Sequence, residues 1–336
     1  MDINSVIPTL DLQKLQFFCT VSYTDSITQA TEILHVSQSY LSKCISSLEK
    51  KLGVELFERS GNRIRLNSYG MVFRKRAEAA IAEINNGLNE INALQRQRSM
   101  QVSISTSNYE ITTMIEQFII DHPNYTMFHT VKSLLELKIL LMLGTLDFGI
   151  ITCDDTGEFS DSSIVAERLV EDEVMLLVSA SSEFANCREG VSLKDLAGKP
   201  FVLAKGPLEY PREICRFLYD SEYSPRIMLE SYNTNTTRRM VANGLAYSFI
   251  TLVEWYELKT SRDKIMSGTE IIKKGTRAIR IRDNGCKRML YLISNRNHVL
   301  SKGALAFKEY TLNYFAQIRD YVGTLLSNGS GEARNE

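Results

Sequence analysis

Apolar residues recur at helical spacing through the first part of the chain and predict three helices there. The first begins after Asp11, and its inward positions are Leu12, Leu15, Phe18 and Cys19. The second is short and begins at a Ser-x-x-Gln capping box at residues 26–29. The third is capped by Ser37, and its apolar stripe comprises Leu41, Ile45, Leu48 and Leu52. Two short helices joined by a tight turn predict a helix-turn-helix.

Residues 56–66 read as two short strands around a Ser-Gly-Asn turn. In the second strand, Ile64 and Leu66 alternate with Arg63 and Arg65. Because side chains alternate between the two faces of a strand, both arginines are expected on the solvent face. The pattern therefore predicts a β-wing beside the helix-turn-helix, with arginines placed to meet a sugar-phosphate backbone or a minor groove. This winged helix-turn-helix domain is predicted over residues 9–67.

A long linker helix is predicted over residues 68–97, capped by Asn67 or Ser68. Its apolar positions are spaced 4, 3, 4 and 3 residues apart, as in a heptad seam: Ala77, Ile81, Ile84, Leu88 and Ile91. Two interpretations stay open at this point. The seam either joins two copies of the chain in a dimer, or packs against its own domain.

From residue 98 onward, short β-rich runs alternate with amphipathic helical ones, which is typical of α/β units. Two helix-Gly-strand elements, around Gly144 and Gly244, resemble each other and predict two similar lobes. The first lobe is predicted over about 98–172 plus 277–325, and the second over about 173–276. Residues 326–336 are rich in Gly, Ser, Asn and Glu and are expected to be disordered. The fold class is therefore α + α/β.

Composition restricts the class of protein. The chain has 336 residues, of which 44% are apolar, and a formal net charge of −1. No run reaches the roughly 18 apolar residues of a membrane span, and residues 1–5 lack the start of a secretory signal, so a cytoplasmic location without membrane contact is expected. Charge is uneven, because residues 37–76 contain nine basic and three acidic side chains, a net of +6. The cationic surface is thus confined to the predicted DNA-docking face.

The six cysteines contain no Cys-x-x-Cys pair, and the four histidines form no ligand cluster, so neither a metal nor another cofactor is expected. No nucleophile elbow, phosphate-binding glycine loop or His-Glu-x-x-His motif is present, which argues against an enzyme. A solute receptor of the transport type would lack the N-terminal 96 residues and would carry a signal peptide. One alternative keeps DNA binding but replaces a ligand by thiol oxidation, at Cys153 and Cys187.

The outward face of the third helix carries short hydrogen-bonding groups and one cation, with no carboxylate before Glu49. Gln38 could pair with adenine, and Lys43 could reach guanine or a phosphate. The alternative is an ordinary solvated helix face. The candidate DNA-binding residues of the whole domain are Ser26, Thr28, Ser37, Gln38, Ser39, Tyr40, Ser42, Lys43, Ser46, Arg59, Arg63 and Arg65.

Three segments resemble the N-terminal signature of LysR-type transcriptional regulators: residues 25–30 (Asp-Ser-Ile-Thr-Gln-Ala), 34–43 and 48–59. The resemblance implies a DNA-binding winged helix-turn-helix, a dimerising linker helix and a periplasmic-binding-protein-like effector domain with a small-molecule cleft between its lobes. It further implies a homodimer or homotetramer on palindromic promoter DNA, with RNA polymerase as a partner to consider. Ser39-Tyr40 stands where Pro-Ala is common in the family, and Cys44 where Gln is frequent, which bears on base preference.

A cleft between lobes is a preferred ligand site, and helix N-termini that follow parallel strands favour anions. Polar residues at these points are the candidate effector-binding residues: Ser105, Thr106, Ser107, Ser133, Thr152, Lys205, Asn233, Thr234 and Asn235. For each of them the alternative is that the side chain only caps a helix.

Overall fold

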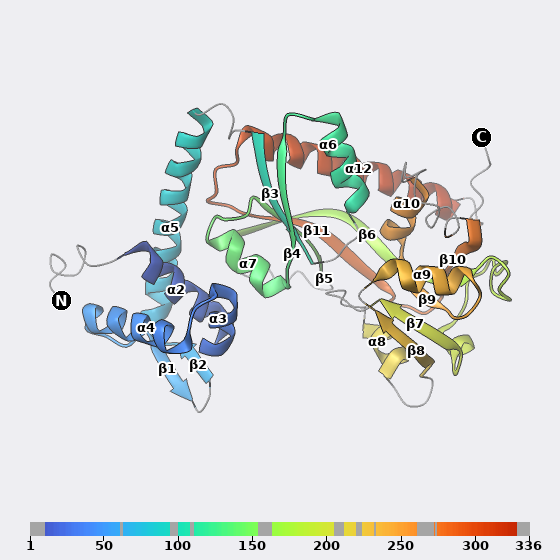
Figure 1. The fold of residues 1–336 in the computed structure, drawn as a ribbon, viewed down its shortest axis with the longest axis horizontal. Helices are drawn as coiled ribbons and strands as arrows, with labels where there is room; N and C mark the ends of the chain where they lie inside the picture. The colour runs from blue at the N-terminus through green and yellow to red at the C-terminus, as the bar shows by residue number, and fades with distance from the viewer. Residues whose placement is uncertain are drawn as a thin grey trace.

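The N-terminal part of the chain folds as three helices followed by a two-stranded wing (Figure 1). The computed structural model describes residues 11–60, 63–94, 100–107, 111–153, 163–204, 212–219, 224–231, 233–260, 272 and 274–327. The helices are α2 (Leu12–Thr24), α3 (Ile27–Leu34) and α4 (Gln38–Leu52). Phe18, Leu41 and Leu48 are completely buried between them. The predicted stripe of α4 is confirmed, and Cys44 adds a fifth buried position to it.

The wing consists of β1 (Phe57–Ser60) and β2 (Arg63–Leu66), paired antiparallel. Helix α5 (Ser68–Leu94) follows. Asn67 rather than Ser68 caps it, because the Oδ1 atom of Asn67 accepts a hydrogen bond of 2.9 Å from the backbone N–H of Gly70. The long linker helix predicted from the sequence is therefore present.

The first lobe is built on parallel strands β3 (Gln101–Thr106), β4 (Thr126–Val131) and β5 (Phe148–Cys153), with β3 in the middle. Strand β11 (Lys287–Asn295) continues the sheet antiparallel to β5. Helices α6 (Thr112–Asp121) and α12 (Lys302–Ser327) pack on one face, where the Phe118 and Phe307 rings lie 5.1 Å apart. Helix α7 (Leu134–Met142) packs on the other face through Leu137 and Leu141.

The second lobe contains β7 (Pro200–Ala204) and β8 (Arg226–Ser231), which pair in parallel, and β9 (Ser248–Thr251) and β10 (Thr276–Arg280). Its helices are α8 (Arg212–Tyr219), α9 (Thr234–Ala242), α10 (Leu252–Thr260) and the short 3-10 helix η4 (Leu193–Leu196). Gly144 and Gly244, which follow α7 and α9, have φ angles of +67° and +73°. Both therefore occupy the left-handed conformation expected at a helix C-terminus.

Strand β6 (Ile164–Ser179) passes through both lobes. Its residues 164–173 pair with β11, and its residues 174–179 pair with β9 and β10. The sequence pattern predicts only 174–179 as strand and overlooks α10 and β10. Strand β10 pairs with the second-lobe end of β6 and therefore belongs with the second lobe. The lobe boundary predicted at about residue 277 places β10 in the first lobe instead.

Near the C-terminus, α12 runs to Ser327, and residues 328–336 of the predicted tail lie outside the described residues. Within the described part of the chain, no helix combines the length and the apolar character needed to cross a bilayer.

Candidate functional site

The polar face of α4 is open to solvent. Gln38, Ser39, Lys43 and Ser46 are exposed, and Ser42 is half-buried, while the apolar stripe on the other side of the helix is buried in the domain. In Figure 1, α4 lies on the side of the domain away from the two lobes, and the wing extends from the lower end of the domain. The candidate base-reading side chains are therefore available to a partner from outside the chain.

Two of the candidate DNA-binding serines act as helix caps. The Ser37 hydroxyl accepts a hydrogen bond from the backbone N–H of Tyr40, and the Ser26 hydroxyl accepts one from that of Gln29, each 3.3 Å long. The capping box predicted at 26–29 is only half formed, since the backbone N–H of Ser26 bonds to the Thr24 hydroxyl. Thr28, on the first turn of α3, is exposed.

Tyr40 ties the start of α4 to α2, a role that the sequence does not reveal. Its ring meets Phe17 edge to face with centroids 5.8 Å apart, and its hydroxyl donates a hydrogen bond of 3.4 Å to Gln13. Contact with the Cys44 thiol raises the pKa of the Tyr40 hydroxyl, which therefore remains a neutral donor near pH 7. Because the ring is 45% exposed, Tyr40 can still face a ligand from this position.

In the wing, Ile64 is buried and Arg65 is exposed, as the alternation predicts. Glu58 is the cross-strand partner of Arg65, so this arginine faces an acidic neighbour as well as solvent. The side chains of Arg59 and Arg63 lie outside the described residues.

The predicted seam of α5 splits into two parts with different environments. Ala77 and Ile81 are buried at 3% and 0% exposure in the core of their own chain. Ile84, Leu88 and Ile91 are 47%, 51% and 55% exposed. As dimer contacts, Ala77 and Ile81 are thus wrong, because intrachain packing already covers them. The exposed part of the seam is available for a second chain.

The carboxyl edge of the first-lobe strands carries five of the candidate effector-binding residues, which end or follow β3, β4 and β5: Ser105, Thr106, Ser107, Ser133 and Thr152. Ser105 and Thr106 end β3 and are fully buried; their hydroxyls bond to the Thr130 carbonyl and to the His129 ring, each at 3.1 Å. Burial lowers the pKa of His129. Ser107 is buried at the same edge, where its backbone N–H donates to the Ile150 carbonyl.

Ser133 follows β4 and forms a complete capping box with Glu136. Glu136 accepts from the Ser133 backbone N–H and hydroxyl at 3.1 and 2.8 Å. Burial alone would raise the pKa of Glu136, but the bonds from Ser133 and the charge of Lys132 outweigh burial and lower it. Thr152, half-buried, lies near the end of neighbouring β5.

In the second lobe, Asn233 caps α9 by accepting a 3.2 Å hydrogen bond from the backbone N–H of Thr236. Thr234 and Asn235 lie in the first turn of this helix. Lys205 lies outside the described residues. A hollow of about 580 Å³ on this lobe has Glu173, Arg188 and Arg280 in its lining, and none of the candidate effector-binding residues belongs to it. For the redox alternative, Cys187 is half-buried, and the Cys153 side chain lies outside the described residues.

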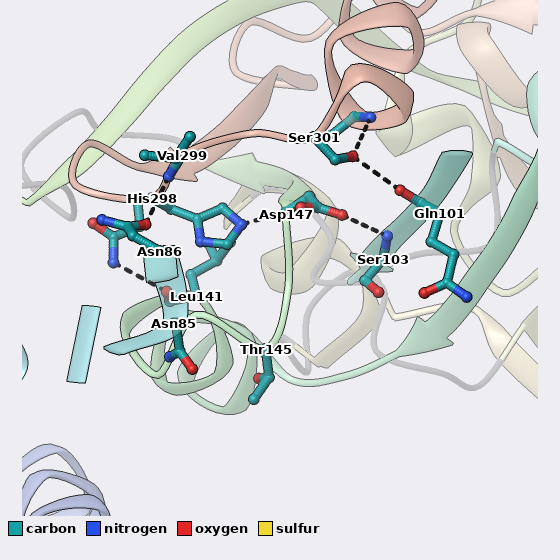
Figure 2. Close-up of polar contacts among 12 residues, drawn as sticks. Asn85, Asn86, Gln101, Ser103, Leu141, Thr145, Asp147, His298, Val299 and Ser301 are labelled. Atoms are coloured by element: carbon teal, nitrogen blue, oxygen red, sulfur yellow. Dashed lines mark hydrogen bonds and ion pairs between the residues drawn. The ribbon is translucent and has the colours of Figure 1, made fainter. Parts of the chain in front are cut away.

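A junction between α5 and the first lobe, which the sequence pattern does not predict, is shown in Figure 2. The Asn86 side chain donates to the Asn297 carbonyl at 2.8 Å and accepts from the Val299 backbone N–H at 2.9 Å. Between these two backbone positions, the His298 ring contacts Asp147 at 3.1 Å, and Asp147 accepts from the Ser103 backbone N–H at 2.7 Å. Asn85 donates to the Leu143 carbonyl at the end of α7.

Comparisons with known proteins agree with this architecture. Residues 12–71 match the model of the bacterial regulatory helix-turn-helix proteins of the lysR family, and residues 93–259 match that of the LysR substrate binding domain. The transcriptional regulator YybE of Bacillus subtilis is 27% identical over 92% of this chain and 100% of its own length. For YeiE of Escherichia coli, the identity is 27% over 77% and 85%.

A solved structure of a full-length OxyR variant from Pseudomonas aeruginosa has the same fold, with a TM-score of 0.50 at 18% identity over 91% of this chain and 94% of that one. Both parts of the chain thus match one family, in the order that the fold displays. The chain belongs to the LysR family of transcriptional regulators, which join a DNA-binding helix-turn-helix to an effector-binding domain.

Proposed function

We propose that this regulator reads an operator in double-stranded DNA with the polar face of α4, while the wing holds the sugar-phosphate backbone. The observation that carries this proposal is that Gln38, Lys43 and Ser46 stay exposed, although the opposite side of α4 is buried and the effector-binding domain packs against the same DNA-binding domain. A small-molecule effector is proposed to bind between the lobes, at the edge that carries Ser105 and Ser133. No catalytic step is proposed, in keeping with relatives that are named as transcriptional regulators.

Removing a side chain that reads a base and removing one that contacts the DNA backbone are expected to change DNA affinity in different ways. Gln38→Ala and Lys43→Ala are each expected to make the free energy of binding to DNA with the preferred base less favourable by about 1–3 kcal/mol, and so to relax the preference at that base pair. Arg65→Ala is expected to weaken binding to all sequences and to reduce the salt slope by about one unit. Mobility-shift titrations at several salt concentrations, on duplexes from the DNA beside the protein's own gene, measure both effects. Lys302→Ala, an exposed lysine of α12, is the control. If the Gln38→Ala, Lys43→Ala and Arg65→Ala proteins all bound these duplexes like the parent, the proposed docking mode would be contradicted.

We further propose that two chains associate through the exposed part of the α5 seam, so that paired helix-turn-helix units match a palindromic site. We also propose, because the chain belongs to this family, that two dimers can assemble into a homotetramer and that the regulator can contact RNA polymerase.

Leu88→Glu is expected to turn the dimer into a monomer, because it would bury an unpaired carboxylate between two chains. Its affinity for a palindromic duplex should fall at least about tenfold, with unchanged unfolding of the monomer because Leu88 is 51% exposed. Sedimentation velocity measures the first effect. Leu305→Glu, at a position 53% exposed on α12, is the matched control. A dimeric Leu88→Glu protein would exclude this face as the interface.

A further inference from the structure

Helix α7 connects the proposed effector edge with the DNA-binding domain. Its N-cap, Ser133, follows β4 at the carboxyl edge of the first-lobe sheet. Its other end, at Leu143 and Gly144, lies against Asn85 of α5. In Figure 1 the helix lies between the sheet and the DNA-binding domain. A nine-residue helix is about 13 Å long, so a single rigid element spans the two sites.

The two sides of α7 belong to different hydrophobic cores. Ile139 and Leu143 are buried in the core of the DNA-binding domain, with Leu135 packed against it. On the other side, Leu137 and Leu141 are completely buried in the first lobe. Because closely packed side chains transmit displacement rather than absorb it, movement of α7 relative to its sheet must also move the surface on which α2 and α5 lie.

The contact at the C-terminal end of α7 is close and specific. Gly144 has a φ of +67°, and a Cβ atom at this position would lie 2.6 Å from the Nδ2 atom of Asn85. The absence of a side chain at residue 144 therefore allows Asn85 to reach the Leu143 carbonyl. Asn86, the next residue, holds the 297–299 backbone at two points. Helix α5 is thus fixed to the first lobe by hydrogen bonds as well as by apolar packing.

At the other end, the hydrogen bonds of Ser133 are those that a ligand at the effector edge would alter. Glu136 occupies both the backbone N–H and the hydroxyl of Ser133. A ligand group that takes either donor would have to displace the carboxylate and loosen the first turn of the helix. Ligand binding at Ser133 would thus replace the observed capping box by a second arrangement, as an element that responds to binding requires.

We propose that α7 carries the effector signal from the proposed effector edge to the DNA-binding domain, through Ser133 at one end and the Asn85–Leu143 contact at the other. This inference rests on the proposed function, since it assigns the regulatory route of the same edge. A ligand at the edge shifts α7, and α7 in turn changes the orientation of α2 and α5, which carry the recognition helix of each subunit.

A double-mutant cycle in the full-length chain tests this route without the effector. Ser133→Ala removes the cap at one end, and Asn85→Ala removes the contact at the other. Sites this far apart normally combine additively to within about twofold. If α7 couples them, their effects on affinity for the operator duplex should depart from additivity by more than that. Ser133→Thr keeps a capping hydroxyl and should behave like the parent.

Amide hydrogen exchange of the DNA-free protein supplies the second measurement. Ser133→Ala is expected to speed exchange roughly fivefold at the α5 segment around Asn85 as well as at the start of α7, the factor expected for loss of a serine cap. Ser192→Ala, which removes an equivalent capping box at η4 in the second lobe, is the matched control and should leave α5 unchanged.

The outcomes separate the two proposals. Additive effects in the cycle, or exchange changes confined to the mutated end of α7, overturn the route through α7 while operator binding by the parent keeps the proposed function intact. A parent protein that binds no duplex overturns the proposed function, and the α7 route fails with it.

Discussion

Asp172→Ala is expected to destabilise the effector-binding domain by about 3–5 kcal/mol, because it leaves the Arg288 guanidinium buried without its carboxylate. The Asp172 and Arg288 side chains are 0% and 2% exposed, with Nη2 3.1 Å and Nε 3.2 Å from Oδ2. The other carboxylate oxygen accepts a 3.0 Å hydrogen bond from the backbone N–H of Val253 in the first turn of α10. One substitution therefore removes an ion pair and a helix-terminal hydrogen bond together.

The position of Asp172 makes this loss relevant to both lobes. It lies on β6 where pairing with β11 gives way, two residues later, to pairing with β9. We therefore expect the connection between the lobes to loosen when this carboxylate is removed, in addition to the loss of stability.

Denaturant unfolding followed by tryptophan fluorescence measures the effect selectively, because Trp255, the single tryptophan of the chain, lies on α10 two residues after Val253. Glu171→Ala is the matched control. Glu171 pairs with Lys287 on the same two strands at 2.6 Å, but these side chains are 57% and 52% exposed. An exposed pair contributes less than about 1 kcal/mol. Equal losses in the two variants would show that burial of the Asp172 pair has no special weight.

The DNA-binding domain could be predicted from the sequence because its determinants are local. The stripe of α4 repeats within a single helix, and the caps Asp11, Ser37 and Asn67 each bond to a backbone N–H three residues further on. Such patterns need no knowledge of the rest of the fold. The family resemblance rests on the same segment. The helix-turn-helix family model matches residues 12–71, which contain this segment.

The effector-binding domain depends on partners distant in sequence, so less of it could be predicted. Charged residues such as Glu167 and Arg168 interrupt the apolar pattern in the first half of β6, which forms a strand by pairing with β11 more than a hundred residues later. The candidate effector residues show the same limit. Ser133 and Asn233 are natural caps and do cap helices, and a cap looks the same in the sequence whether or not a ligand also contacts it.

The seam of α5 shows a third limit, because a heptad pattern identifies an apolar face but not what covers it. Ala77, Ile81, Ile84, Leu88 and Ile91 follow one rule of spacing. The structure buries the first two in the core of the DNA-binding domain, which also contains Ile139 of α7 and Leu143 at its C-terminal end. Neither of these α7 residues could be connected to α5 from its sequence neighbours alone.

Two isoleucines of this seam, three residues apart, are therefore expected to respond very differently to the same substitution. Ile81→Ala should lower the free energy of unfolding of the DNA-binding domain by about 2–5 kcal/mol, because a fully buried side chain is removed from an intrachain core. Ile84→Ala, at a side chain 47% exposed, should change the unfolding of an isolated chain by less than about 0.5 kcal/mol.

Protein concentration distinguishes the two losses. Association stabilises a folded chain by mass action, so a residue at the interface contributes more as concentration rises. The Ile84→Ala loss should therefore be small in dilute solution and grow with concentration, while the Ile81→Ala loss should stay constant. Amide exchange of α2 and α5 over a hundredfold range of protein concentration measures both. If the Ile81→Ala loss instead grew with concentration, Ile81 would be a contact between chains, and its burial within one subunit would not account for its role.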